Sequence, residues 1–470
     1  MKMLLNGQWV DRSQKIEVCD PQDGSLVDTV PRASVDDMEA AIAAAQDGFE
    51  RARALPAHRR MSILRQAAQT MEREHESFAR TIAREGIKTI REARKEVTRC
   101  IQTLQISAEE ARRLNGETIP FDQMPGSENR VGYYRREPIG IIGAITPFND
   151  PLNLVAHKVG PALAAGNAII VKPDSKTPLS ALKLAQAVHD AGIPPGILQV
   201  ITGDGRDVGH ALVVDPRVRM ISFTGGLDTG LKIMENVGLK KVGMELGSNS
   251  PVIVMPDADL EDAVAANVSG AFRAAGQNCL HVQRLLIHED VYEQFCNRFI
   301  EQTEQYDVGD KLSEDTDMGP LINESAARRV ERLVNQALTD GATLLTGGSR
   351  SGAFYAPTVL AGVPDHTPLA REEIYGPVTI FYRFSELDEA IRRANDVEYG
   401  LQAGIFTNDL GTALDAAARL ECGGVMINDS TDYRIDAMPF GGVKGSGLGR
   451  EGIRFALQEM TEPKVICFNL

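Results

Sequence analysis

The 470-residue chain has a formal net charge of −15 and is 43% hydrophobic, which suits two or three globular domains. This charge disfavours nucleic acid or an acidic membrane as a general partner, and no apolar run approaches the length of a membrane span. Six cysteines without a close pairing pattern, and an N-terminus without the apolar segment of a secretory signal, predict a reducing compartment and a cytoplasmic location.

The first part of the chain is predicted to be helical. Helical patterns cover residues 34–55, 57–85 and 89–114. Ser34 opens the first of these patterns and is followed by the acidic residues Asp36 and Asp37, which is typical of a capped helix start. Glycine and proline then interrupt the strand-like stretch 115–137, which predicts a projecting hairpin or arm rather than a domain.

From residue 138 onward, apolar strands alternate with helices. The predicted strands are 139–145, 168–172, 197–201 and 219–223, and the helices between them are 152–165, 178–191 and 205–213. Buried strands that alternate with helices imply a parallel sheet covered on both faces, an architecture typical of dinucleotide-binding domains. A second α/β series runs from 251–255 to about 427. The terminal stretch 464–470 predicts one last strand, which we expect to extend another subunit's sheet.

Two junctions after predicted strands suit a nucleotide. One strand ends at Lys172, whose cation would reach a ribose or a phosphate. Another ends at Thr224, followed by Gly225 and Gly226 and then a helical pattern, so backbone N–H groups would face a phosphate. A glycine pair after a strand is by itself more typical of an ordinary turn, but two such junctions on successive strands favour a ligand crevice.

Cys279 has the most unusual setting of the six cysteines, because Gly276 and two amide residues precede it in a predicted tight turn. A thiolate is a strong nucleophile, although most free cysteines are inert and the other five fit small buried positions. Glu245 lies among apolar residues before Gly247. It is either a buried general base with a raised pKa or a charge at a strand end, and local sequence leaves these alternatives even.

Several motifs then coincide in one order, and the chain resembles the aldehyde dehydrogenase superfamily over essentially its whole length. The motifs that carry the resemblance are 146-TPFND-150, 169-IIVKP-173, 222-SFTGG-226, 244-MELGS-248, 276-GQNC-279, 372-EEIYGPV-378 and 439-PFGGVKGSGLGREG-452. The resemblance implies an α/β fold with a Rossmann-like cofactor domain, an α/β catalytic domain and a small β oligomerisation arm. It implies no metal.

The resemblance also implies how the domains divide the chain. The cofactor-binding domain would comprise residues 1–115 and 136–247, and the catalytic domain residues 248–446. The segments 116–135 and 447–470 would form the oligomerisation arm and C-terminal strand of a homo-oligomer, a dimer or a tetramer.

The mechanism that the resemblance implies begins with attack of the Cys279 thiolate on an aldehyde carbon. The side-chain amide of Asn149 and the backbone N–H of Cys279 would hold the oxyanion of the thiohemiacetal. Oxidation by NAD or NADP gives a thioester, and Glu245 would activate the water that hydrolyses it. The product is therefore a free carboxylic acid.

The same resemblance assigns the cofactor contacts. The matching residues are Thr146, Pro147, Phe148, Lys172, Ser175, Lys176, Phe223, Gly225, Gly226, Leu246, Glu373 and Tyr375. Glu373 would bind the nicotinamide ribose, Tyr375 would lie beside the nicotinamide, and Lys172 would contact the adenosine ribose. Where the family often has a glutamate that disfavours a 2′-phosphate, this chain has Ser175 followed by Lys176. We therefore expect NADP to be accepted, and to be preferred if Lys176 faces the adenosine ribose rather than solvent.

The substrate assignment depends on two arginines. The segment 427–452 is similar to a branch that contains archaeal-type lactaldehyde, phosphonoacetaldehyde and sulfolactaldehyde dehydrogenases. Arg434 and Arg99 match positions that border the substrate tunnel, so they would favour a small hydroxylated or anionic aldehyde. The alternative is that Arg434 forms a structural ion pair, for instance with Asp432 or Asp436. Asn278 argues against phosphonoacetaldehyde, because enzymes of that type have an arginine before the nucleophile.

Two other functions compete with hydrolytic oxidation. A dehydrogenase that transfers the acyl group to coenzyme A typically lacks the glutamate equivalent to Glu245. A non-catalytic binding or structural protein on this fold would be free to lose Cys279, Glu245 or Asn149, and all three are present.

Overall fold

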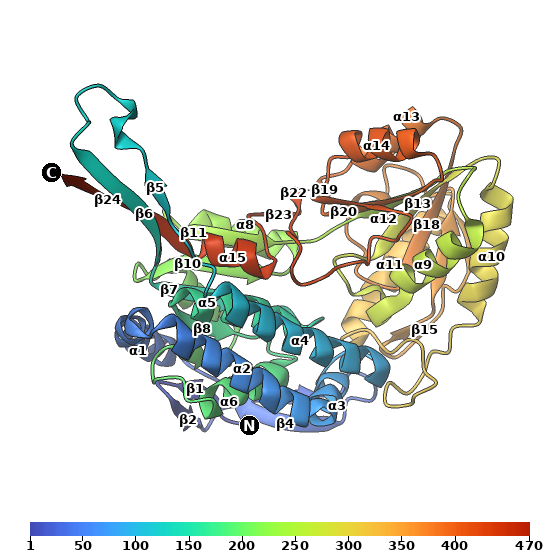
Figure 1. The fold of residues 1–470 in the computed structure, drawn as a ribbon. Coiled ribbons are helices and arrows are strands. Elements are labelled where there is room, and N and C mark those ends of the chain that lie inside the picture. Colours follow the sequence, from blue (N-terminus) through green and yellow to red (C-terminus); the bar gives the residue numbers. More distant parts are fainter.

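The computed structural model describes residues 1–470 and contains two α/β bodies and a projecting arm of β-strands (Figure 1). The first body is built on an eight-stranded sheet with the strand order β2-β1-β9-β8-β7-β10-β11-β23. Its strands are β1 (Met3–Leu5), β2 (Gln8–Val10), β7 (Ile141–Ile145), β8 (Ala168–Lys172), β9 (Leu198–Val200), β10 (Val218–Thr224), β11 (Lys241–Glu245) and β23 (Gly447–Leu448). Strands β7 to β11 run parallel, as the alternating pattern predicts.

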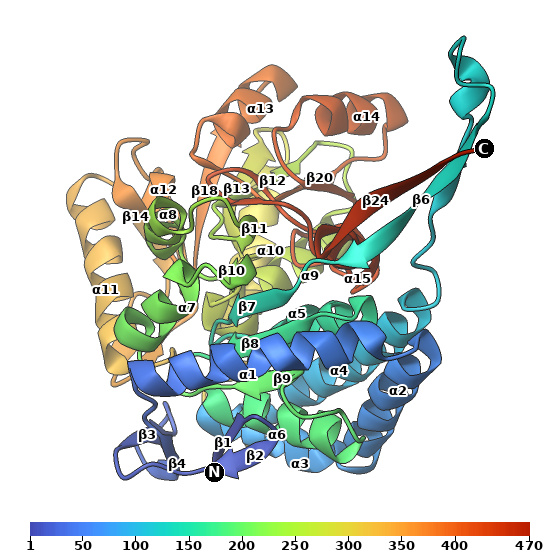
Figure 2. The same cartoon turned by 90° about the vertical axis from the view of Figure 1, so that its left-hand side faces the viewer.

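The helices of the first body cover both faces of this sheet. They are α1 (Val35–Ala54), α2 (Ala57–Arg73), α3 (His75–Glu85), α4 (Ile90–Glu110), α5 (Asn153–Ala165), α6 (Pro178–Asp190), α7 (His210–Val214) and α8 (Leu227–Asn236). Successive residues of β7 divide between two cores: Ile141 packs with α1, which crosses one face (Figure 2), and Ile142 packs with α4 to α6 on the other. Ser34 and Thr89 close capping boxes at the starts of α1 and α4.

One predicted helix is divided in the structure. The pattern over 57–85 forms α2 and α3, which meet at Glu74, where the backbone leaves helical geometry at φ −106° and ψ 19°. Both helices bury their apolar faces against α4 and α6. The helical spacing of the apolar residues therefore continues across Glu74, so the sequence pattern does not reveal the break.

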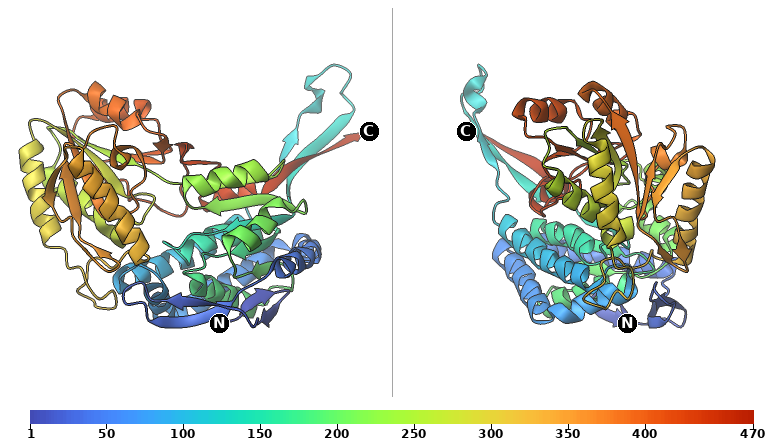
Figure 3. Two further views of the ribbon diagram at one scale, coloured as in Figure 1. Left: turned by 180° about the vertical axis from the view of Figure 1, so that it is seen from behind. Right: turned by 90° about the vertical axis from the view of Figure 1, so that its right-hand side faces the viewer.

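The second body is built on a seven-stranded sheet with the order β14-β17-β18-β13-β12-β20-β21. Its strands are β12 (Ser250–Val254), β13 (Val282–His288), β14 (Thr343–Thr346), β17 (Thr358–Ala361), β18 (Val378–Phe384), β20 (Gln402–Phe406) and β21 (Gly424–Ile427). Its helices are α9 (Leu260–Phe272), α10 (Tyr292–Glu304), α11 (Glu324–Thr339), α12 (Pro368–Arg371), α13 (Leu387–Asn395) and α14 (Leu410–Arg419). From behind, the two bodies lie side by side (Figure 3).

The arm leaves the first body and consists of β5 (Glu117–Ile119), β6 (Arg130–Pro138) and β24 (Thr461–Asn469). The strand expected over 464–470 is present as β24, which pairs antiparallel with β6 of the same chain along its whole length and lies at the edge of this sheet. Its extension of another subunit's sheet stays a prediction. The preceding helix α15 (Ile453–Glu459) packs on α5 and brings the chain to the base of the arm, so β24 begins beside β6. No helix in the structure combines the length and apolar character needed to cross a membrane.

Candidate active site

A cavity of about 1160 Å³ opens at the carboxyl ends of β7, β8, β10 and β11, where ligands bind in open parallel sheets. Residues of the second body complete its lining. The predicted site residues on the lining are Thr146, Pro147, Phe148, Asn149, Lys172, Phe223, Gly225, Gly226, Glu245, Leu246, Cys279, Glu373 and Tyr375. The fold therefore brings together residues that lie more than 200 positions apart in the sequence.

One end of the cavity has the properties of a nucleotide site. Gly226 precedes α8 without a side-chain cap, so the first N–H groups of the helix have no side-chain acceptor and suit a phosphate. A Cβ on Gly225 would come within 2.5 Å of the Phe223 ring, which explains the glycine there. The buried hydroxyls of Thr146 and Thr224 lack hydrogen-bond partners. These polar groups fit a dinucleotide that runs along this edge.

The predicted adenosine end is only partly on the lining. Lys172 is buried at the end of β8, and burial lowers its pKa while Asp174 and Asp204 oppose that shift. Asp174 faces the cavity beside it, but Ser175 and Lys176 line a neighbouring hollow of about 550 Å³ instead. The exposed Lys176 ammonium lies 5.5 Å from the centre of the Phe148 ring.

Cys279 follows a turn in left-handed backbone conformation. Ala274 (φ 51°), Ala275 (φ 53°) and Gly276 (φ 67°) all adopt this geometry, which strains the two alanines. A Cβ on Gly276 would lie 2.1 Å from the carbonyl oxygen of Gly376, so only glycine fits. The tight turn expected before Cys279 is present, and its backbone strain was not evident from the sequence.

The thiol of Cys279 is half-buried and lies 3.8 Å from Oδ1 of Asn278. Burial raises its pKa to about 12, and the positive charge of Arg434 opposes this shift. The thiol is therefore protonated at neutral pH and needs a base before it can attack.

Glu245 lines the same cavity and is 5% exposed, with no hydrogen-bond partner for Oε2. Burial raises its pKa well above the ordinary value, and the neighbouring Glu451 carboxylate raises it further. Of the two interpretations that the sequence left open, the buried carboxyl group with a raised pKa agrees with this environment.

Glu451 belongs to a buried group of charges behind Glu245. Its Oε1 accepts from Lys158 Nζ at 3.1 Å and its Oε2 from Arg434 Nη2 at 3.0 Å. Although burial opposes the effect, these two cations lower the pKa of Glu451. Glu451 therefore remains a carboxylate, and its charge faces Glu245. Sequence reasoning missed both Lys158 and Glu451; the one charged lysine in the mostly apolar helix over 152–165 was the available signal.

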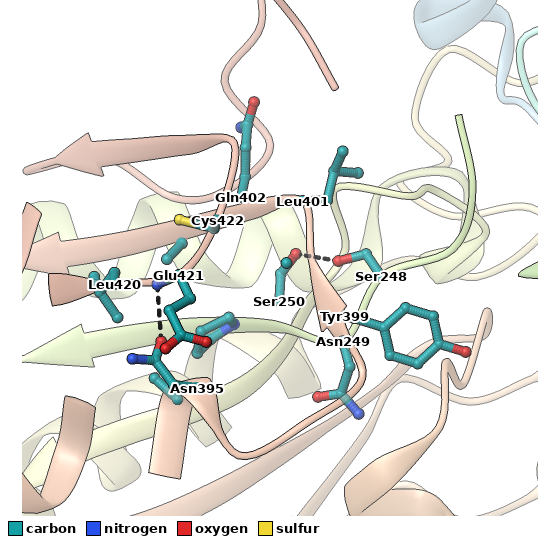
Figure 4. Close-up of a pocket in the computed structure, with 14 residues that line it drawn as sticks. Ser248, Asn249, Ser250, Asn395, Tyr399, Leu401, Gln402, Leu420, Glu421 and Cys422 are labelled. Carbon is teal, nitrogen blue, oxygen red and sulfur yellow. Dashed lines mark hydrogen bonds between the residues drawn. The ribbon is translucent and has the colours of Figure 1, made fainter. Parts of the chain in front are cut away.

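Glu373 is held at the other side of the cavity. Its Oε1 accepts from the backbone N–H of Ser248 at 3.0 Å, and burial raises its pKa to about 7. A Cβ on Gly247 would come within 2.6 Å of Oε2, so this close approach requires glycine. The Ser248 hydroxyl turns away and bonds the Ser250 hydroxyl at 2.5 Å (Figure 4). The serine that replaces the family's second glycine therefore leaves Glu373 undisturbed.

The two predicted substrate arginines do not line the cavity. Arg99 donates to Asp436 at 2.8 Å. Arg434 pairs with Glu451 and lies 3.6 Å from the centre of the Phe440 ring, and its buried Nε has no partner. The alternative that Arg434 makes a structural ion pair agrees with this contact, but its carboxylate partner is Glu451 and not Asp432 or Asp436.

Asp150, whose effect on local polarity the sequence left open, is also paired. Its carboxylate contacts the buried ammonium of Lys88, which also binds Glu96 at 2.8 Å. Glu96 in turn accepts from the backbone N–H of Leu152 and of Asn153 at the start of α5. These contacts fix the segment that follows Asn149.

The model of the aldehyde dehydrogenase family matches residues 9–466. Aspartate-semialdehyde dehydrogenase 1 of Pseudomonas canavaninivorans is 54% identical over 97% of each chain. The 3-sulfolactaldehyde dehydrogenase of Priestia aryabhattai is 45% identical over 100% of this chain and 98% of its own length. The crystal structure of glyceraldehyde-3-phosphate dehydrogenase GapN from Methanocaldococcus jannaschii, complexed with NADP, superposes with a TM-score of 0.94 at 41% identity, over 98% of this chain and 100% of that one.

The raised thiol pKa predicts how Cys279 reacts with an alkylating reagent. Alkylation by iodoacetamide should accelerate roughly tenfold per pH unit from about pH 7 to pH 9, because the thiolate fraction increases over this range. Peptide mass spectrometry would measure Cys279 separately from the exposed Cys19 and Cys467. A rate that levels off below about pH 8 would contradict the predicted protonation state.

Proposed function

Because the chain belongs to the aldehyde dehydrogenase family, we propose that Cys279, Glu245 and Asn149 carry out the NAD(P)-dependent oxidation of an aldehyde to its carboxylic acid. The observation that carries this assignment is their arrangement. A half-buried thiol, a buried carboxyl group without a partner and a side-chain amide line one cavity, which continues to the uncapped start of α8.

In the proposed first step, Glu245 accepts the Cys279 proton and the thiolate attacks the aldehyde carbon. The Asn149 amide and the Cys279 N–H donate to the oxyanion of the resulting thiohemiacetal. Bound NAD(P) supplies the two-electron oxidation that converts this thiohemiacetal into a thioester. Glu245 releases this first proton to solvent and then takes a proton from the water that attacks the thioester. The carboxylic acid leaves, and the protonated Glu245 returns its proton to the Cys279 thiolate.

The lining supports a dinucleotide and, we infer, the acceptance of NADP. Glycines and helix N–H groups fit the pyrophosphate, Glu373 is placed to accept from a ribose, and Lys172 offers a cation at the adenosine end. Ser175 adds no carboxylate near that cation, and Lys176 is exposed close to it. Asp174 is the one acidic group on the lining beside Lys172, so it limits a preference for the 2′-phosphate.

We propose a small aldehyde that carries an acidic group as the substrate. The names of the three relatives point to substrates with a carboxylate, a sulfonate and a phosphate, respectively. In this chain we take Arg434 as the candidate for binding such a group, because its Nε has no hydrogen-bond partner and its charge acts on both Cys279 and Glu245. Arg99 would contribute from α4 only if it shares its guanidinium with Asp436.

The domain division and assembly are also proposals. The sheet memberships support a cofactor domain over 1–115 and 136–247 and a catalytic domain over 248–446. The arm has a free edge along β24, and Val465 and Phe468 are exposed on it. Strand β21 is the edge of the second sheet and exposes Ile427. These two edges support a homo-oligomer in which the arm of one subunit extends the sheet of another. Six unpaired cysteines support a reducing, cytoplasmic location.

The catalytic assignment is tested with Cys279→Ser. Aldehyde-dependent NADPH formation should fall about 1,000-fold or more, because a hydroxyl is a far weaker nucleophile than a thiolate. The exposed Cys467→Ser is the matched control and should retain activity. Full activity in Cys279→Ser would refute the mechanism. With coenzyme A added to the wild type, faster formation of acyl-CoA than of free acid would instead support the acyl-transferring alternative.

Cofactor choice is tested with Ser175→Glu. A carboxylate next to Lys172 should repel the 2′-phosphate, so the ratio of kcat/KM with NADP to that with NAD should fall about tenfold or more. Ser351→Glu, at an exposed position in the second body, controls for the added charge. An unchanged ratio would mean that residue 175 does not face the adenosine ribose.

The substrate class is tested with Arg434→Met. The kcat/KM for succinate semialdehyde relative to butanal should fall about 10- to 100-fold, which is the range expected for one charge-assisted hydrogen bond. This ratio cancels any general effect of leaving Glu451 with fewer partners. Arg99→Met is the matched comparison and should change the ratio less, because Asp436 already occupies that guanidinium. Equal losses for both aldehydes in Arg434→Met would assign Arg434 a purely structural role.

A further inference from the structure

Asp432 contacts both ends of the strained turn that precedes the nucleophile. Its Oδ2 accepts from Arg273 Nη1 at 2.8 Å, on the residue directly before the left-handed alanines. Its Oδ1 accepts from the side-chain amide of Asn278, the residue directly before Cys279. One carboxylate therefore spans the turn from its first residue to the neighbour of the thiol.

These contacts determine which way the Asn278 amide faces. With Nδ2 donating to Asp432, Oδ1 points to the other side, where it accepts from the backbone N–H of Leu280 at 3.1 Å and lies 3.8 Å from Cys279 Sγ. A reversed amide would place its NH₂ group against the Leu280 N–H and an oxygen against the carboxylate. Asp432 therefore fixes a carbonyl oxygen beside the thiol.

The strained turn needs such contacts to persist. A residue in left-handed geometry costs about 1–2 kcal/mol unless it is glycine, and Ala274 and Ala275 are consecutive. Glu92 accepts from the Ala274 N–H at 2.8 Å. Gln277 donates to the Ala274 carbonyl at 3.2 Å. Both contacts hold the turn itself, whereas Asp432 connects it to the segment 430–436.

That segment makes a second contact on the other side of the nucleophile. The hydroxyl of Thr431 donates to the carbonyl of Leu280 at 2.7 Å, so consecutive residues of the segment bind the residues before and after Cys279. Arg434, two positions further on, pairs with Glu451 behind the proposed base. The segment thus contacts the surroundings of both reacting groups.

We propose that Asp432 is a positioning residue: through Asn278 it holds the orientation of the Cys279 thiol, and through Arg273 it joins the nucleophile turn to the segment that carries Arg434. This inference rests on the proposed role of Cys279 as nucleophile. Asp432 itself does not touch the aldehyde in this account, and it acts through the Asn278 amide.

The test compares Asp432→Asn, Asp432→Ala, Asn278→Ala and the double variant Asp432→Asn/Asn278→Ala, with Asp429→Asn as the control. Asp429 lies on the same segment, and its carboxylate accepts from the Ser430 N–H. The rate of the NADPH burst in a single turnover should fall about 10- to 100-fold in Asp432→Ala, since a misplaced nucleophile slows attack. It should fall less in Asp432→Asn, which keeps an oxygen for Asn278, and it should stay within twofold in the control.

A double-mutant comparison separates positioning from general destabilisation. In the Asn278→Ala background, Asp432→Asn should change the burst rate less than twofold, because the contact through which Asp432 acts is already absent. The dissociation constant for NADP should remain within about twofold in all variants, since none of the altered residues lines the cavity. If the fold-losses in burst rate of the two single variants multiply in the double variant, the proposal is overturned.

A second readout does not depend on turnover. Removing the fixed carbonyl oxygen in Asn278→Ala, or its support in Asp432→Ala, should favour the thiolate, so iodoacetamide should alkylate Cys279 about 3- to 10-fold faster at pH 7.5. Unchanged alkylation together with an unchanged burst would overturn the proposal even though the wild type oxidises aldehydes. A wild type without any burst would instead refute the proposed function.

Discussion

Three acidic side chains, Cys279, Glu245 and Glu373, face one cavity, and burial raises the pKa of each of them. Other groups fixed by the fold add to these pKa shifts or oppose them. Lys158 and Arg434 keep Glu451 ionised beside Glu245, and a backbone N–H stabilises the carboxylate of Glu373. The site therefore depends on charges fixed by the fold rather than on solvent.

The segment 430–436 shows how the fold maintains these charges. Its alternate residues Asp432, Arg434 and Asp436 bind, respectively, the nucleophile turn, Glu451 and the start of α5. Asp436 accepts from Asn153, His157 and Arg99 together. Both bodies contact this one segment. A shift of the segment on the side where the substrate is proposed to bind would therefore change the surroundings of Cys279 and of Glu245 together.

Local patterns in the sequence were sufficient for much of the fold. Ser34 and the acidic first turn identify α1, and strand-helix alternation identifies the parallel strands β7 to β11. The break at Glu74 was not predictable, because the helical period continues through it. The pairing of β24 with its own chain also lies outside local sequence, since it depends on where α15 places the strand.

Where a motif fixed both residue type and position, as for Cys279, Glu373 and the glycine pair Gly225 and Gly226, the residues lie on the lining of one cavity, as expected. The partners of ion pairs could not be predicted in this way. One arginine has several acidic neighbours in the sequence, and packing determines which carboxylate it binds. Arg434 lies two residues from Asp432 and from Asp436, yet it pairs with Glu451, while Asp432 pairs with Arg273. Nothing in the sequence around Lys158 indicates that it binds Glu451, which lies 293 residues further along the chain.

The raised pKa values of Cys279 and Glu245 are best understood together. For each unit by which the pKa of the thiol exceeds the pKa of its proposed base, transfer of the proton costs about 1.4 kcal/mol. A thiol with a pKa of about 12 would transfer its proton very unfavourably to an ordinary carboxylate. Burial and the Glu451 charge raise the Glu245 pKa as well. The difference between the pKa values of Cys279 and Glu245 is therefore smaller than it would be with an ordinary carboxylate. Arg434 lowers the pKa of both groups, and it therefore favours the charged form of each.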